Sequence, residues 1–311
     1  MSKPTQSPLL SIAAWSARHL PVSMKRALYR SGPLARLLRG ELNRAAPQGM
    51  STVTIAAGEL QGTILSLDMQ TEKDYWLGTY ETDLQTALHT LVKPGMIAYD
   101  VGANVGYISL ILAKLVGAGG KVFAFEAFPE NVTRLQANLE LNGCLEATLT
   151  PNERVLSSTA EKTGDAEILG EVTVVPAAVV DKAGPVSFLV GPSGGMGKAE
   201  GSAGRQDVAY HEKISIVGIS LDEFVYQQGN PPPQLVKIDI EGGEVLALPG
   251  MKRLLKEAHP VLLMELHGPE AAQVAWETLQ AAGYRICRMQ PGFTPVPSLD
   301  VLDWKSYLVG F

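Results

Sequence analysis

Polar residues that could do chemistry close several apolar runs in this sequence of 311 residues. Each run is typical of a buried strand, and each ends in carboxylates or an imidazole. Because the carboxyl ends of parallel strands meet at one edge of a sheet, we expect these side chains to form a rim beside a ligand. The rim residues are Asp100, Glu126, Asp239, Glu241, Glu265 and His267.

The first two of these strands flank a glycine-containing turn. Residues 97–126 read IAYDVGANVGYISLILAKLVGAGGKVFAFE, which predicts a strand, a loop over 102–106, a helix and a second strand. Gly102 and Gly106 let the backbone turn with positive φ and approach a ligand closely. The helix then begins with free N–H groups directed at that ligand. Glu126 is placed to accept hydrogen bonds from ribose hydroxyls, so we predict a nucleotide-like cofactor.

The glycine spacing discriminates between cofactors. A dinucleotide site reads G-x-G-x-x-G, whereas here the order is G-A-N-V-G with Asp100 directly before it. An aspartate at this point would repel a pyrophosphate but would pair with the ammonium group of S-adenosyl-L-methionine, which carries no phosphate. The pattern resembles the class I methyltransferase cofactor loop. The predicted cofactor-binding residues of this unit are Asp100, Gly102, Ala103, Asn104, Gly106 and Glu126. An NAD-dependent oxidoreductase on a Rossmann fold remains the alternative.

Composition narrows the class of protein. The 46% hydrophobic content is ordinary for a folded domain, and no apolar run reaches the roughly 20 residues of a membrane span. Two cysteines, Cys144 and Cys287, cannot build a disulfide framework, which indicates a reducing cytoplasm. The acidic body of the chain lacks a basic aromatic surface, so a nucleic-acid substrate is disfavoured.

Charge is unevenly distributed along the chain. Residues 1–50 carry eight basic residues against Glu41 alone, a net +7, and the remainder carries 18 basic and 31 acidic residues, a net −13. We interpret 1–50 as a basic amphipathic helical arm. It either attaches to an anionic membrane surface or packs on the acidic main domain, and the second interpretation is favoured. The predicted localisation is cytoplasmic, with peripheral membrane contact through the arm as the alternative.

The rest of the chain divides into two further parts. Residues 51–92 predict a β-hairpin and a helix, and Glu81 is a candidate to cover the methionine end of the cofactor. Residues 93–311 form the predicted cofactor-binding domain, including one helix from Glu244 to Lys256. Two segments interrupt it. Residues 144–170 read as a surface insertion with one extra strand around Val155 or Ile168. Residues 191–204 are rich in glycine and serine, so we expect them to be mobile and unable to pack.

Several segments together resemble the FkbM family of S-adenosylmethionine-dependent methyltransferases. They include KPGMIAYDVGANVGYISL, FAFEAFPENVTRLQANLELNG, LVKIDIEGGEVLALPGMKRLL and PVLLMELH. The resemblance covers roughly residues 75–290, and KIDIEGGE followed by LPG is its most specific part. It implies an α/β, class I methyltransferase (Rossmann-like), doubly wound, mostly parallel seven-stranded sheet, preceded here by the arm and hairpin. It also implies O-methylation of a sugar, glycan or secondary-metabolite hydroxyl. The segments 144–170 and 191–204 depart from the family pattern and weaken any transfer of substrate identity.

An acceptor hydroxyl needs a base, because a protonated alcohol is a poor nucleophile. His267, with an ordinary pKa of about 6.5, and Glu241 are the predicted bases, and Asp239 completes the catalytic group while touching the methionine end of the cofactor. Alternatively, Asp239, Glu241 and Glu265 hold Mg²⁺, an ion that prefers oxygen ligands; this interpretation is not favoured. A cofactor-binding module without turnover is the non-enzymatic alternative. The sequence leaves the acceptor and the oligomeric state open.

Overall fold

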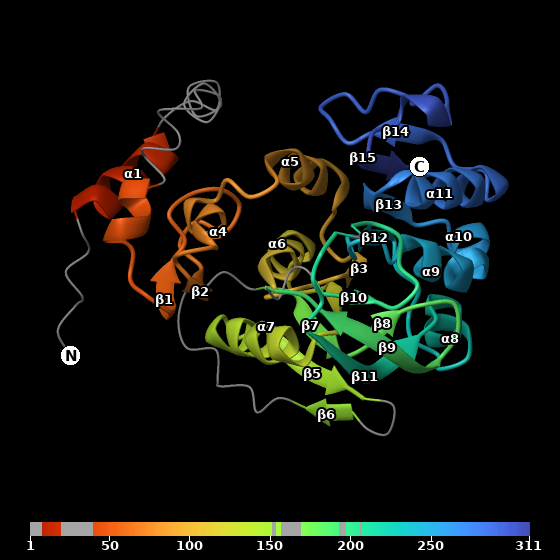
Figure 1. Cartoon of the computed structure of the whole chain (residues 1–311), viewed down its shortest axis with the longest axis horizontal. Coiled ribbons are helices and arrows are strands. Elements are labelled where there is room, and N and C mark those ends of the chain that lie inside the picture. Colours follow the sequence, from red (N-terminus) through yellow and green to blue (C-terminus); the bar gives the residue numbers. More distant parts are fainter. Residues whose placement is uncertain (1–7, 20–39, 151–153, 157–168, 193–196, 206) are drawn as a thin grey trace. The chain divides into compact units, whose positions relative to one another are not determined.

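The computed structural model describes residues 8–19, 40–150, 154–156, 169–192, 197–205 and 207–311 (Figure 1). The chain divides into two compact units, Met1–Thr82 and Asp83–Phe311. All six predicted rim residues belong to the second unit, whereas Glu81 belongs to the first.

The first unit contains the predicted hairpin. Strand β1 (Met50–Thr54) pairs antiparallel with β2 (Ile64–Asp68), and helix α4 (Lys73–Leu77) follows. Burial alternates along β2, so that Leu65 and Leu67 are fully buried while their neighbours are more exposed. Helix α1 (Pro8–His19) contacts α4. Residues 20–39 of the predicted arm lie outside the described residues. No helix in the described part of the chain is long and apolar enough to span a bilayer.

The second unit is built on a mixed sheet in the order β14-β15-β13-β12-β3-β4-β7-β5-β6. The strands from β13 to β5 in this order are parallel, and β15 runs antiparallel to β13 and β14. The order of the strands reverses between β3 and β12, because β4 and β7 follow on one side of β3, and β12 and β13 on the other. Such a reversal creates a crevice beyond the carboxyl ends of the two strands. The predicted doubly wound sheet is confirmed, but in the described residues it has nine strands rather than seven, because two strands extend a core of seven. The core strands are β3 (Ile97–Val101), β4 (Lys121–Phe125), β7 (Glu171–Val175), β12 (Leu235–Ile238), β13 (Val261–His267), β14 (Ile286–Arg288) and β15 (Lys305–Gly310).

Two further strands extend this sheet at the segment predicted as an insertion. Strand β5 (Leu145–Leu149) pairs parallel with β7, and β6 (Arg154–Leu156) pairs antiparallel with β5. The expected extra strand near Val155 is therefore present, whereas Ile168 lies outside the described residues. The expectation that the segment from residue 144 onward is surface insertion is wrong for Leu145–Leu149. Leu145 and Ala147 of this strand are buried. A segment this short offers too few positions for its alternation of buried and exposed residues to be clear in the sequence.

Helices cover both faces of the sheet (Figure 1). Helix α6 (Tyr107–Val116) packs on β3, β4 and β7, and α7 (Pro129–Leu141) on β7 and β5. On the other face, Tyr99, Phe123 and Phe125 pack edge-on or tilted around Phe224. The remaining elements are α5 (Thr82–Leu91), α8 (Leu221–Tyr226), α9 (Glu244–Ala247), the 3-10 turns η2 (Leu248–Met251) and η3 (Leu299–Val301), α10 (Lys252–Glu257) and α11 (Pro269–Ala281).

The helix predicted as continuous from Glu244 to Lys256 is divided into α9, η2 and α10. The break falls at Pro249 and Gly250, where proline lacks the N–H that an α-helix requires. A Cβ atom on Gly250 would lie 2.2 Å from the carbonyl oxygen of Val180, so the two backbone segments approach each other closely here. The prediction of one helix is wrong for this reason.

A second, smaller sheet has the order β10-β9-β11-β8. Its strands are β8 (Ala178–Val179), β9 (Gly184–Val190), β10 (Lys198–Ala199) and β11 (Glu212–Ile219). Strand β10 lies inside the glycine-rich segment that was expected not to pack. That expectation is wrong for the described residues 197–204, because Lys198, Ala199, Ser202 and Ala203 are buried; residues 193–196 lie outside the described part.

Candidate functional site

The loop between β3 and α6 is shaped by close backbone contacts. Gly102 has φ 81°, and a Cβ atom there would lie 1.9 Å from the carbonyl oxygen of Asp239. Gly106 has φ 91° and directly precedes α6, and a Cβ atom on it would lie 2.7 Å from a methyl group of Leu135. Only glycine fits either position. The loop is therefore pressed against the end of β12, at the point where strand order reverses.

Glu126 locks the same loop from the end of β4. Its Oε2 accepts a hydrogen bond from the N–H of Asn104 (2.8 Å), and its Oε1 accepts one from the N–H of Phe128 (2.9 Å). Burial raises the pKa of Glu126, and these N–H groups offset part of that effect. Its Oε1 accepts a further hydrogen bond from Asn131 Nδ2 (3.5 Å), whereas its Oε2 keeps a second lone pair with which Glu126 can accept from a ligand hydroxyl.

Asp100 has its partners inside the protein. Its carboxylate is fully buried, accepts a hydrogen bond from Ser109 Oγ (2.6 Å) and lies 3.2 Å from Lys237 Nζ. Lys237 also donates to the carbonyl oxygen of Gly102 (2.9 Å). This differs from the expectation that Asp100 pairs directly with a cofactor ammonium. In the structure it holds Lys237, which in turn holds the glycine loop.

The turn after β12 is held by the glycine-rich segment. Gly242 accepts a hydrogen bond from the N–H of Ala203 (2.9 Å), and a Cβ atom on Gly242 would lie 2.3 Å from the carbonyl oxygen of Ala203. Lys198 Nζ, which is buried, donates to the carbonyl oxygens of Ala203 (3.0 Å) and Arg205 (2.9 Å). Burial lowers the pKa of Lys198. The Lys198 ammonium thus fixes the segment that rests on the Glu241–Gly242 turn.

His267, at the end of β13, is surrounded by carboxylates. Its Nε2 lies 3.0 Å from Glu265 Oε1 and 3.7 Å from Glu241 Oε2, and its Nδ1 lies 3.4 Å from Glu244 Oε1. Burial lowers the pKa of His267, but the hydrogen bonds to Glu244 and Glu265 outweigh it and raise the pKa to about 10. The imidazole is consequently protonated at neutral pH. This differs from the expected neutral base.

Glu265 and Asp239 respond in opposite ways to this environment. Burial alone would raise the pKa of Glu265, but hydrogen bonds from His267 and from Lys305 lower it to about 2. Burial raises the pKa of Asp239 to about 6, with Lys237 and His267 opposing and the Glu265 and Glu241 charges reinforcing the shift. Asp239 is partly exposed. It is therefore a carboxylate that can exchange a proton near neutrality.

Backbone strain coincides with the predicted site. Among the described residues, five that are not glycine have positive φ: Glu81, Asn104, Glu241, His259 and Phe293. The first three, at φ 42°, 49° and 52°, are predicted site residues. Strained conformations persist where the surroundings over-determine them, and they gather at ligand sites. Glu81 lies in the first unit, just before α5, and its role stays a prediction.

A divalent metal does not fit this cluster well. Ligand atoms of Asp239, Glu265 and His267 lie within 4.8 Å of one another. However, Glu265 already has two cationic neighbours, since Lys305 pairs with it and His267 Nε2 lies 3.0 Å from its Oε1. We therefore attribute no step of the chemistry to Mg²⁺.

The structure adds four ionisable residues that the sequence analysis did not identify. They are Lys198, Lys237, Glu244 and Lys305. For Lys237 a signal was available, because a lysine inside a run of buried strand residues needs a buried partner. Its register partner on β3 is Asp100. Glu244 and Lys305 depend on contacts between distant segments, whereas Lys198 donates to carbonyl groups five and seven residues further along the chain.

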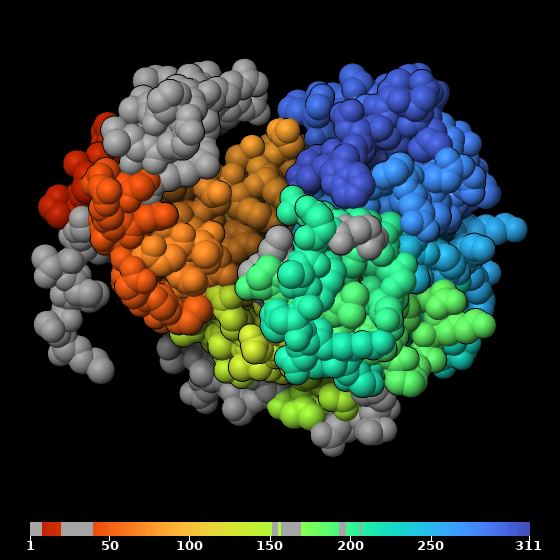
Figure 2. Space-filling model, in the orientation of Figure 1, coloured from red at the N-terminus to blue at the C-terminus, as the bar shows by residue number. Residues whose placement is uncertain are grey.

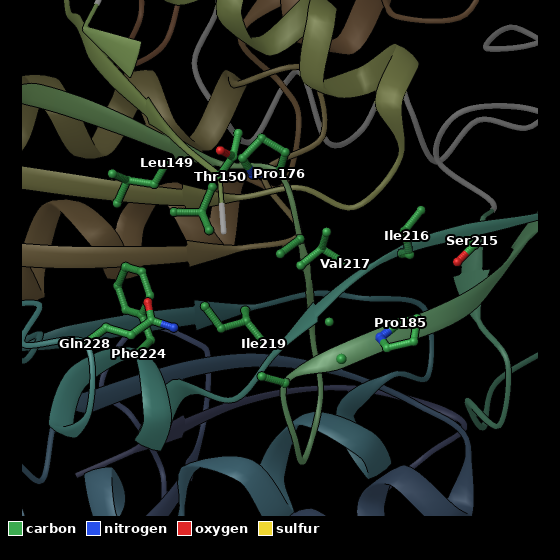
Figure 3. A pocket seen from close by; sticks show the side chains of 15 residues that line it. Leu149, Thr150, Pro176, Pro185, Ser215, Ile216, Val217, Ile219, Phe224 and Gln228 are labelled. Carbon is green, nitrogen blue, oxygen red and sulfur yellow. The ribbon is translucent and has the colours of Figure 1, made fainter. Parts of the chain in front are cut away.

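A cavity of about 620 Å³ lies elsewhere in the second unit (Figure 3). Its lining is mainly apolar and comes from the ends of β5 and β7, from β9 and β11, and from α8. Phe224, Ile219 and Val217 contribute side chains, and Gln228 contributes one of the few polar groups. None of the predicted site residues lines it.

Comparisons with known proteins identify a methyltransferase domain in this chain. The Methyltransferase FkbM domain matches residues 100–286. The hexuronic acid methyltransferase AglP of Haloferax volcanii is 28% identical over 171 residues, which are 55% of this chain and 56% of that protein. A protein-L-isoaspartate O-methyltransferase of Aeropyrum pernix is 47% identical over 51 residues, 16% of this chain and 20% of that protein. The matches thus span about half and one fifth of the lengths of these relatives.

Solved structures show weaker similarity. A methyltransferase FkbM from Methylobacillus flagellatus is similar with a TM-score of 0.41 and 18% identity. The similarity covers 79% of this chain and 56% of that chain. An S-adenosylmethionine-dependent O-methyltransferase from Thermotoga maritima has a TM-score of 0.41 and 14% identity, covering 87% and 80% of the two chains. The assignment of the fold therefore rests on the order of the strands and on the matched domain.

Proposed function

The chain belongs to the FkbM methyltransferase family, and on that premise we propose that it binds S-adenosyl-L-methionine and methylates a hydroxyl of a sugar or glycan. Its sheet is the class I methyltransferase sheet, with β5 and β6 added at one edge. The observation that carries the proposal is the contact between Gly102 and the carbonyl oxygen of Asp239. It brings the glycine loop and the IDIEGGE turn together in one crevice.

The crevice suits a cationic ligand without phosphate. We assign cofactor contacts to the backbone of Gly102, Ala103, Asn104 and Gly106 and to the side chains of Glu126 and Asp239. Carboxylates on this rim attract an ammonium or a sulfonium and repel a pyrophosphate, which disfavours NAD. When bound, S-adenosyl-L-methionine supplies an electrophilic methyl group. We further propose that residues 93–311 form the catalytic domain and that 1–50 and 51–92 precede it as separate parts.

We assign the base to Asp239 rather than to His267. A base must be able to take up a proton, and at neutral pH Asp239 is the deprotonated partner with a pKa of about 6, whereas His267 already carries its proton. Asp239 would accept the hydroxyl proton as the acceptor oxygen forms its bond to the methyl carbon. His267 and Glu241 then have different roles. The imidazolium holds Glu241 and Glu265 in place, and Glu241, with its side chain 40% exposed, is available to accept hydrogen bonds from the acceptor.

A sugar acceptor is supported by two considerations. The relative from Haloferax volcanii is a hexuronic acid methyltransferase, although the match spans only 56% of it. Carboxylates at the rim also suit sugar hydroxyls, since each ionised carboxylate offers up to four acceptor sites.

Calorimetry and product release test the proposal. We expect S-adenosyl-L-methionine to bind and NAD not to bind. Release of S-adenosylhomocysteine is then measured over a panel of uronic acids, neutral sugars and short glycans. Tight NAD binding without S-adenosyl-L-methionine binding would refute the cofactor assignment. Binding without release on any acceptor would favour a module without turnover.

A further inference from the structure

Helix α1 has two apolar faces. Leu10 and Ala17, seven residues apart, share one face and are buried. Leu9, Ile12 and Trp15 follow one another at intervals of three residues, so they share another face. Ile12, in the middle of this face, lies about 200° around the helix axis from Leu10. These three side chains are 45%, 61% and 58% exposed. We call Leu9, Ile12 and Trp15 the outer face of α1; the helix lies at the surface of the molecule (Figure 2).

The charge of the sequence that contains this helix indicates what the outer face fits. Residues 1–40 contain seven lysines and arginines and no acidic residue. Helices that lie in a bilayer interface combine exposed leucine and tryptophan with nearby basic residues, and anionic lipids attract such segments. The acidic remainder of the chain would be repelled by the same lipids.

We propose that the outer face of α1 inserts into the interface of an anionic lipid bilayer. Trp15 is the principal anchor, since its ring pairs an apolar body with an N–H that favours the headgroup level. It stacks on His19 at 4.9 Å between ring centroids, which orients it. This docking surface uses none of the residues assigned to the methyltransferase site.

Vesicle flotation of the full chain tests this surface. We expect the wild-type chain to float with mixed phosphatidylcholine–phosphatidylglycerol vesicles and to remain below with phosphatidylcholine alone. Trp15→Asp and Ile12→Asp should each lower the bound fraction on the order of tenfold, because a charge replaces buried apolar surface. Val301→Asp, at a valine that is 38% exposed in the second unit, is the matched control and should float as the wild type does.

Three outcomes would overturn the proposal. Wild-type protein that stays below with anionic vesicles excludes the lipid surface. A doubled mass in sedimentation, abolished by Trp15→Asp, would assign the outer face to a second copy. A lower melting temperature of Trp15→Asp without vesicles, with no change for Val301→Asp, would assign it to packing on the chain itself.

Discussion

Replacing Gly102 by alanine tests whether the glycine loop forms the cofactor site. A Cβ atom there would lie 1.9 Å from the carbonyl oxygen of Asp239, whereas ordinary contacts begin at 3.4 Å, so the two strand ends must separate by about 1.5 Å. A positive φ at alanine adds about 1–2 kcal/mol of strain. Displacements near 1 Å in a site can cost about 100-fold in rate, and we expect Gly102→Ala to lose cofactor affinity and activity to a similar extent.

Gly117→Ala is the matched control. Gly117 also has positive φ, 63°, but no atom lies within 4 Å of the position of its Cβ. Both variants should therefore melt at a lower temperature than the wild type, Gly102→Ala more so because its Cβ also meets the Asp239 carbonyl, while only Gly102→Ala loses affinity in calorimetry with S-adenosyl-L-methionine. Wild-type affinity in Gly102→Ala would refute the assignment, as would an equal loss of affinity in Gly117→Ala.

Four further predictions follow from the ionised groups. Asp239→Asn should lower kcat about 10²–10⁴-fold, and wild-type kcat should rise with pH through about 6 as Asp239 loses its proton, measured by release of S-adenosylhomocysteine. Lys237→Met leaves Asp100 buried without its partner and should cost about 3–5 kcal/mol in denaturant unfolding. The pKa of His267 is raised to about 10 in the folded state, so its contribution to stability is full below about 6.5 and is lost as pH rises through about 10; melting temperatures of His267→Gln should fall less over that interval. Lys198→Met should increase hydrogen exchange over residues 197–205, because Ala203 and Arg205 lose their donor.

Controls and contrary results are specific to each variant. Lys213→Met is the control for Lys198→Met, because Lys213, on the same small sheet, makes an exposed ion pair with Glu200. Equal exchange in the two variants would exclude a fixing role for Lys198. If kcat of Asp239→Asn depended on pH as the wild type's does, the role of base would be assigned to Glu241 instead. Parallel pH dependence of wild type and His267→Gln would show that the imidazolium does not stabilise the fold.

Much of the site was predictable because its signals are local. Gly102 and Gly106 follow an apolar run and precede a helix, and this order predicts both the loop and the positive φ that the structure has. The expected positions of Asp239 and Glu265 at strand ends are also correct, since β12 and β13 lie side by side in parallel. The ion pair of Asp100 with Lys237 and the raised pKa of His267 were not foreseeable from the spacing of residues.

The sequence by itself determined the doubly wound sheet, the glycine loop and the membership of the rim, because hydrophobic periodicity and glycine spacing are properties of consecutive residues. Only the tertiary structure decided how the rim residues are charged. Strand pairing places Lys237 against Asp100, and folding brings Glu244, Glu265 and Glu241 around His267. A pKa depends on burial and on the charges within a few ångströms, and residues far apart in the sequence supply both.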